Sequence, residues 1–218
     1  MPERSYRVLF WVLALVGLAA DQATKYGVFS WLADVPGNTR VLFADRDHRG
    51  FALVAQFEHN DDGTWKKTAD GHKVPHVNHG ALFGFLRDYE SLANIGFAVI
   101  SFLAAAAILY WSTQETTARD VALCAALGLI LAGTLGNLYD RLVFNGVRDF
   151  LHWNYLFDWP VFNVADCCLV VGAGLLLFQA FTSKPAAEPA KKHVAAVAQP
   201  HEAARAGQEA VVAADRYR

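Results

Sequence analysis

The sequence predicts a mainly α-helical, polytopic membrane protein with four transmembrane helices and a small extracytoplasmic β-sheet and loop cradle. Of its 218 residues, 54% are hydrophobic and only 18% are charged, which is a low charge content for a soluble domain of this length. The mean hydropathy is positive. Four apolar segments are each long enough to approach or exceed the thickness of a bilayer, and polar segments separate them.

The first predicted span covers about residues 8–32. An apolar stretch that follows arginines and ends in two alanines is also typical of a secretory signal peptide. Apolar residues resume at Tyr26, however, and roughly 20 residues suffice to cross the hydrocarbon. We therefore expect a retained transmembrane helix, in which Asp21 and Lys25 stand at i and i+4 and form an ion pair on one face.

An extracytoplasmic loop is expected over residues 34–91, where the chain becomes charged and rich in glycine. Residues 40–44 and 50–59 have the β-branched and aromatic content of strands, and the sequence NDDG at 60–63 indicates a hairpin turn. The segment 77–85 resembles neither a regular helix nor a plain strand, so we expect it to be compact and irregular.

The remaining predicted spans cover residues 93–111, 121–136 and 161–181. Residues 1–182 would form a single transmembrane domain, followed by a disordered tail at 183–218 that is rich in alanine, proline and charge. Four spans place both termini on one side of the membrane. The basic residues expected on that side are Arg4, Arg7, Arg119, Lys184, Lys191 and Lys192. Their clustering predicts that this side is the cytoplasm.

Three aspartates, Asp140, Asp149 and Asp166, fall at or near the opposite membrane boundary, where unpaired charge is costly. Carboxylates in such places bind a cation, relay a proton or act as an acid/base pair in hydrolysis. Two carboxylates within about 3 Å share one proton, which makes one member a base and the other an acid. Such a pair can activate water against an amide.

Other chemistries have little support in the sequence. The formal net charge of −2 provides no basic surface for nucleic acid. The motifs GxSxG and HExxH are absent, and Cys124, Cys167 and Cys168 lack metal-ligand or CxxC spacing. We therefore expect no cofactor and no metal, and we interpret the cysteines as small buried hydrophobic residues.

Five segments resemble, in this order, the five motifs of the bacterial lipoprotein signal peptidase family, signal peptidase II. They are DQATK (21–25), NHGALFG (78–84), GNLYDR (136–141), VRDF (147–150) and FNVAD (162–166). The resemblance covers most of the chain, except for the tail and much of the loop that precedes residue 77.

The resemblance implies an intramembrane aspartic endopeptidase of the bacterial inner membrane. Such an enzyme cleaves diacylglyceryl-modified prolipoproteins on the amino side of the lipidated cysteine. Its catalytic dyad would be Asp149 and Asp166. The supporting and substrate-binding residues would be Asp21, Lys25, Asn78, Gly80, Asn137, Asp140, Arg141 and Asn163. The implied partners are lipidated precursors, membrane lipids and globomycin-type inhibitors.

Simpler roles stand beside these assignments. Asp166 would serve as a helix cap, and Asp149 with Arg148 would form a surface ion pair of little energetic value. At the level of function, the same aspartates would suit a four-span carrier of protons or cations, and a non-catalytic membrane scaffold is a third class. A carrier predicts transport without proteolysis, whereas a scaffold predicts that changes to Asp149 or Asp166 leave function intact.

Overall fold

The structure is a computed structural model that describes residues 5–47, 49–80 and 90–182. The predicted tail at 183–218 and residues 81–84 of the second motif lie outside the described residues. All helices and strands named below belong to one compact unit, Met1–Thr182.

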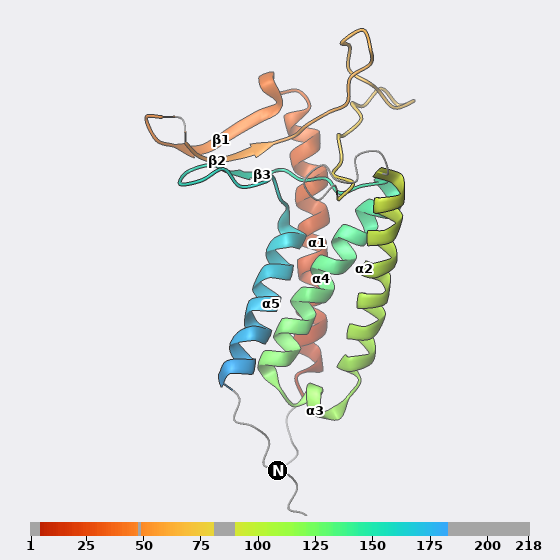
Figure 1. Ribbon diagram of the computed structural model, residues 1–218, viewed down its shortest axis with the longest axis vertical. Coiled ribbons are helices and arrows are strands. Elements are labelled where there is room, and N and C mark those ends of the chain that lie inside the picture. Colours follow the sequence, from red (N-terminus) through yellow and green to blue (C-terminus); the bar gives the residue numbers. More distant parts are fainter. Residues whose placement is uncertain (1–4, 48, 81–89, 183–218) are drawn as a thin grey trace, which may run out of the picture. The chain divides into compact units, whose positions relative to one another are not determined.

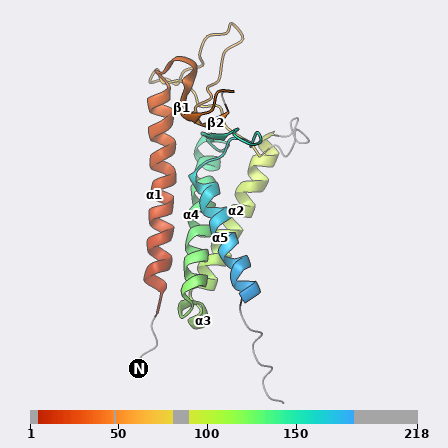
Figure 2. The same ribbon diagram turned by 90° about the vertical axis from the view of Figure 1, so that its left-hand side faces the viewer.

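Four long helices run side by side, and each is long and apolar enough to cross a membrane (Figure 1, Figure 2). They are α1 (Arg7–Leu32), α2 (Glu90–Ser112), α4 (Val121–Phe144) and α5 (Val164–Thr182), with the short α3 (Glu115–Ala118) between α2 and α4. Helix α4 packs against the other three and is the most buried of them. The predicted fold class is confirmed.

The third span differs from its predicted bounds. Asp120 caps the start of α4 by accepting a hydrogen bond from the backbone N–H of Leu123 at 3.0 Å. The helix does not end near residue 136 but continues to Phe144, where Asn145 adopts a left-handed conformation with φ 57°. The fourth span begins at Val164 rather than 161. As a result, the polar residues of the third motif lie on the last turns of α4.

Two apolar clusters stabilise the unit. The first lies within the helix bundle and contains Phe10, Ala14, Ala105, Ile108, Cys124, Leu127 and Leu131. The second joins the end of α1 to the extramembrane segments and contains Phe29, Leu32, Ala55, Phe57 and Phe150. Because Phe150 is only 2% exposed, the segment next to Asp149 is anchored in this second cluster.

A small antiparallel sheet covers one end of the bundle, in the order β1–β2–β3 (Figure 1). Its strands are β1 (Thr39–Ala44), β2 (Gly50–Val54) and β3 (Leu151–Trp153). The first predicted strand is confirmed, but the second, predicted to run to residue 59, ends at Val54. Strand β3 comes from the connection between α4 and α5, so the sheet ties the long loop to the segment that carries Asp149.

Beyond β2 the chain folds into three short extended segments joined by turns. Backbone bridges pair Phe57 with Pro75, His59 with Trp65 and Lys67 with Lys73. The predicted NDDG hairpin is therefore confirmed, with Gly63 at φ 80°. The Nζ atom of Lys73 donates to the carbonyl of Ala33 at 2.5 Å, which fastens this part of the loop to the end of α1.

Candidate active site

Asn163 and Asp166 form a reciprocal cap at the start of α5. The Asn163 side chain accepts from the Asp166 backbone N–H at 3.0 Å, and the Asp166 carboxylate accepts from the Asn163 backbone N–H at 3.1 Å. This arrangement is a capping box: the side chain of the N-cap residue bonds the backbone N–H of the third helical residue, whose side chain bonds the backbone N–H of the N-cap residue. The simpler role of Asp166 in capping the helix is therefore present, from the third helical position, while Asn163 occupies the N-cap position itself. One carboxylate oxygen of Asp166 is free of the cap.

Asp149 lies in the non-helical connection between α4 and α5 and faces the same asparagine. Its carboxylate accepts hydrogen bonds from Nδ2 of Asn163 at 2.6 Å and from Nδ2 of Asn78 at 3.1 Å. Removal from water, together with the nearby negative charge of Asp166, raises the pKa of Asp149 to about 6. The structure thus brings both aspartates of the predicted dyad to one asparagine, with Asp149 prone to hold a proton.

Asn137 on α4 connects this pair to the bundle interior. Its Nδ2 donates to the second carboxylate oxygen of Asp166 at 2.8 Å. Its side-chain oxygen accepts from both Asn163 and Lys25, each at 3.2 Å. The side-chain oxygen and nitrogen of Asn137 are therefore both used, which fixes the orientation of the amide and of the Asp166 carboxylate.

A buried ionic cluster lies on the bundle side of Asn137. Nζ of Lys25 contacts Asp21 at 2.9 Å and Asp140 at 3.4 Å, and all three side chains are fully buried. The expected pair of Asp21 and Lys25 on one helix face is confirmed, and Asp140 of α4 joins it. Asp21 also accepts the backbone N–H of Ala165 at 2.9 Å, so this carboxylate satisfies a free donor at the start of α5.

Arg148 is the second cation of the cluster, and the interpretation of it as the surface partner of Asp149 is wrong. Its side chain is 2% exposed and pairs with Asp140 at 2.8 Å. The guanidinium lies 4.2 Å from the ring centre of Tyr26 and 3.9 Å from that of Phe144. The cluster therefore contains two carboxylates and two cations.

Gln22 is a member of the site that the sequence did not reveal. Its amide nitrogen donates to Asp21 at 2.9 Å, and its oxygen accepts from Arg148 at 3.1 Å. Gln22 follows Asp21 within the first motif, and this position next to a predicted site residue was the signal in the sequence that could have pointed to it. Gly136 packs against the same group, since a Cβ atom there would lie 2.5 Å from the Asp21 carboxylate.

The remaining predicted residues lie at the margin of the site. Gly80 has φ 81°, donates its N–H to the side chain of Asn78 at 2.8 Å, and packs so closely on Phe97 that a Cβ atom would meet the ring at 2.5 Å. Arg141 makes no ion pair with Asp140 among the described contacts. It donates to the Asn137 carbonyl at 3.3 Å, and its guanidinium lies 5.4 Å from the Phe97 ring centre.

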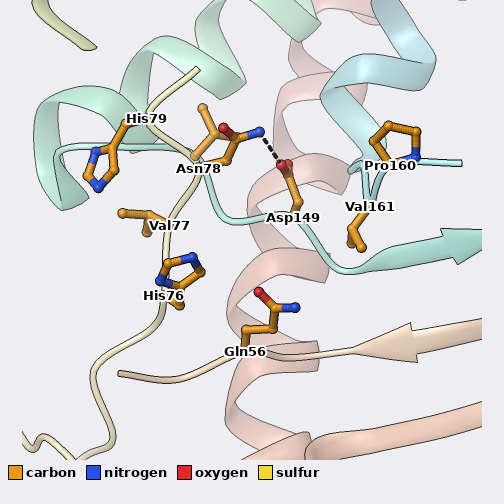
Figure 3. A pocket seen from close by; sticks show the side chains of 9 residues that line it. Gln56, His76, Val77, Asn78, His79, Asp149, Pro160 and Val161 are labelled. Carbon is orange, nitrogen blue, oxygen red and sulfur yellow. Dashed lines mark hydrogen bonds between the residues drawn. The ribbon is translucent and has the colours of Figure 1, made fainter. Parts of the chain in front are cut away.

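A pocket of about 300 Å³ opens beside Asp149 (Figure 3). It is lined by Gln56, His76, Val77, Asn78, His79, Val147, Asp149, Pro160 and Val161. Figure 3 shows the hydrogen bond from Asn78 to Asp149 at its edge, with Val161 and Pro160 on the side of α5. The two histidines His76 and His79 border the pocket. A carboxylate of raised pKa in a partly apolar pocket is suited to acid–base chemistry on a bound substrate.

The fold and the site define a multi-pass membrane protein with two linked aspartates at one end of its helix bundle. Residues 13–182 match the family model described as signal peptidase (SPase) II. The chain therefore belongs to the signal peptidase II family, and it is a peptidase.

Curated relatives agree with this assignment. The lipoprotein signal peptidase of Rhodopirellula baltica is 36% identical over 193 residues, which cover 83% of this chain and 74% of that protein. The lipoprotein signal peptidase of Pseudoalteromonas translucida is 43% identical over 119 residues, covering 54% of this chain and 69% of that protein.

A solved structure described as a bacterial membrane enzyme has the same fold. The two superpose with a TM-score of 0.62 at 22% sequence identity, over 84% of this chain and 99% of the solved one. At this level of identity the likeness concerns the architecture.

Proposed function

We propose that the protein is an aspartic endopeptidase that removes signal peptides from diacylglyceryl-modified prolipoproteins, on the amino side of the lipidated cysteine. The observation that carries the proposal is the placement of Asp149 and Asp166 on one asparagine. Asn163 binds a carboxylate oxygen of each, and the pKa of Asp149 is raised to about 6 by burial and by the charge of Asp166.

In the proposed reaction the two aspartates share one proton. The ionised carboxylate takes a proton from a water molecule, and the resulting hydroxide equivalent attacks the carbonyl carbon of the scissile amide. The protonated carboxyl group gives its proton to the departing nitrogen as the C–N bond breaks. One water is consumed, and the products are a signal-peptide carboxylate and a lipoprotein with a free amino terminus.

The surrounding residues have positioning and binding roles in this scheme. Asn137 and Asn163 orient the dyad through the hydrogen bonds described above. Asn78, which lines the pocket beside Asp149, and the adjacent Gly80 are proposed to contact the substrate backbone. Arg141, at the end of α4, is the group proposed to contact the lipid head group or substrate backbone, and Asp140 braces the site from within.

The substrate is expected to enter sideways from the bilayer, because both its signal helix and its acyl chains are lipid-soluble. Val147, Pro160 and Val161 give the pocket beside Asp149 apolar walls, which suit an apolar segment of the substrate next to the scissile bond. We place the enzyme in the bacterial inner membrane with cytoplasmic termini. The active site would then face the extracytoplasmic side, where globomycin-type cyclic peptides would compete with substrate.

The test uses purified protein in detergent with one prolipoprotein, supplied with and without its diacylglyceryl group. We expect a gel shift only for the lipidated precursor, with mass spectrometry locating the new amino terminus at the modified cysteine. Cleavage of both forms at equal rates would contradict the assigned substrate class. No cleavage of either form, together with proton or cation uptake in liposomes, would replace the proposal with a carrier.

A further inference from the structure

We infer that Arg148 is a positioning residue for this reaction, which ties the backbone that carries Asp149 to the Asp140 carboxylate on α4. The inference rests on the proposed function, because it assigns a role in placing one of the two proposed catalytic groups. Arg148 precedes Asp149 directly, and its side chain points away from the dyad into the buried ionic cluster.

The contacts between Arg148 and Asp140 involve both the main chain and the side chain. Nη2 of the guanidinium donates to Oδ1 at 2.8 Å, and Nε donates to Oδ2 at 3.2 Å. The backbone N–H of Arg148 also donates to Oδ2, at 2.9 Å. A paired fork of this kind restricts both the distance and the angle between its partners. One carboxylate on α4 thus fixes a side chain and the peptide unit that it belongs to.

The segment between the end of α4 and β3 has no regular secondary structure, so its position depends on contacts such as the one between Arg148 and Asp140. Val147 exchanges two backbone hydrogen bonds with Asn78, at 2.8 and 2.9 Å. Phe150 donates its N–H to the carbonyl of Phe162 at 3.0 Å. These contacts hold the connection to the loop and to the start of α5, respectively. Arg148, between them, holds it to α4.

Charge balance gives the arginine a second effect. Asp21 and Asp140 are fully buried, and Lys25 alone would leave their cluster with one uncompensated negative charge. With Arg148 the cluster is neutral, so Lys25 remains shared among Asp21, Asp140 and the amide of Asn137. The same amide holds Asp166. Arg148 therefore acts on both members of the dyad, directly on the backbone of one and through Lys25 and Asn137 on the other.

Three variants separate these effects. Arg148→Met removes both charge and fork, while Arg148→Lys keeps the charge but not the fork. The pair Arg148→Met with Asp140→Leu restores neutrality in an apolar form, which is often tolerated in place of a buried ion pair. Arg119→Met is the control, because this exposed arginine pairs with Glu115 of α3, and α3 lies at the end of the bundle opposite the sheet (Figure 1).

We expect Arg148→Met to lower kcat by roughly 100-fold, the loss typical of a 1 Å misplacement, with much less change in KM. The rate of Arg148→Met should also begin to fall at a higher pH than the wild-type rate. The extra negative charge left on the Asp21 and Asp140 cluster favours the protonated form of Asp149, which therefore keeps its proton to a higher pH. The Arg148→Lys variant should keep the wild-type pH profile but have a reduced kcat. The double variant should fold and regain the pH profile, while its kcat stays low because the tie is gone.

Hydrogen–deuterium exchange of the peptide that covers residues 146–151 tests the tie without any substrate. Loss of the guanidinium fork should speed amide exchange there by at least about tenfold in all three variants, most in the double variant, which also lacks the carboxylate that accepts the backbone N–H, and leave it unchanged in Arg119→Met. Wild-type exchange in all three variants, or wild-type kcat in the double variant, would overturn the inference. If the wild type cleaves no lipoprotein, the proposed function fails, and exchange still decides the positioning role. If Arg148→Met does not fold, the lysine and double variants carry the test.

Discussion

Lys25→Met is the perturbation for which the structure gives the clearest energetic expectation. Nζ of Lys25 contacts Asp21 at 2.9 Å, Asp140 at 3.4 Å and the Asn137 oxygen at 3.2 Å, and the ion pairs are fully buried. Methionine matches the length of the stem but provides no cation. The cluster then holds two carboxylates but only one cation, Arg148, so one negative charge remains buried without a partner.

Removing one partner of a buried ion pair costs about 3–5 kcal/mol. For a protein of this size each kcal/mol lowers Tm by roughly 2–4 °C, so the expected decrease is about 6–20 °C. The matched control is Lys66→Met, since Lys66 pairs with Glu58 at 2.5 Å but is 53% exposed. An exposed pair contributes at most about 1 kcal/mol, so the control should change Tm by no more than a few degrees.

The assay is thermal unfolding in detergent, followed by tryptophan fluorescence. A second variant, Lys25→Met with Asp21→Asn, removes one positive and one negative charge and leaves Asp140 paired with Arg148. It should recover part of the lost Tm. Equal Tm values for Lys25→Met and Lys66→Met, or a double variant less stable than Lys25→Met, would refute the account of the buried cluster.

Further predictions concern the dyad and its packing. Because the pKa of Asp149 is about 6, kcat/KM should fall by about tenfold per pH unit above pH 6, as the shared proton is lost; a flat profile between pH 5 and 8 would contradict this. The same raised pKa means that folding favours the protonated carboxyl group, so its contribution to stability is present below about pH 4 and is lost as the pH rises through about 6. Asn163→Ala should lower stability by about 1 kcal/mol through loss of the cap and should also lower kcat, whereas unchanged kcat would remove Asn163 from the orienting role. Gly136→Ala would place a Cβ atom 2.5 Å from the Asp21 carboxylate and should destabilise the protein by about 1–3 kcal/mol, while Gly96→Ala, whose Cβ atom meets nothing within 4 Å, should not.

Much of the helix bundle could be predicted from the sequence, because the length of an apolar segment is a strong signal for a membrane span. The four helices were predicted in the right order, and the ion pair of Asp21 and Lys25 follows from helical spacing alone. The end of α4 was missed because hydropathy falls where polar residues begin. In the structure those residues stay helical, since Asn137 and Asp140 find buried partners on α1 and α5.

Arg148 shows the limit of reasoning from neighbours in sequence. Adjacent residues in an extended segment point to opposite sides, so Arg148 and Asp149 face different partners. The partner of Arg148 lies eight residues earlier, on a helix that Asn145 ends by a left-handed turn. Only the three-dimensional path of the chain brings these groups together. Similarly, the convergence of Asp149 and Asp166 was implied by resemblance to a family, because charge and burial alone did not separate them from Asp140.

The central claim is that Asp149 and Asp166 cleave the lipidated precursor together, and single substitutions test it most directly. Asp149→Asn and Asp166→Asn are compared with Asp158→Asn, which alters a carboxylate that is 80% exposed and pairs with His152 in the same connection. With the lipidated prolipoprotein as substrate, we expect no detectable cleavage by either dyad variant and wild-type cleavage by the control. Substantial cleavage by Asp149→Asn or by Asp166→Asn would contradict the dyad.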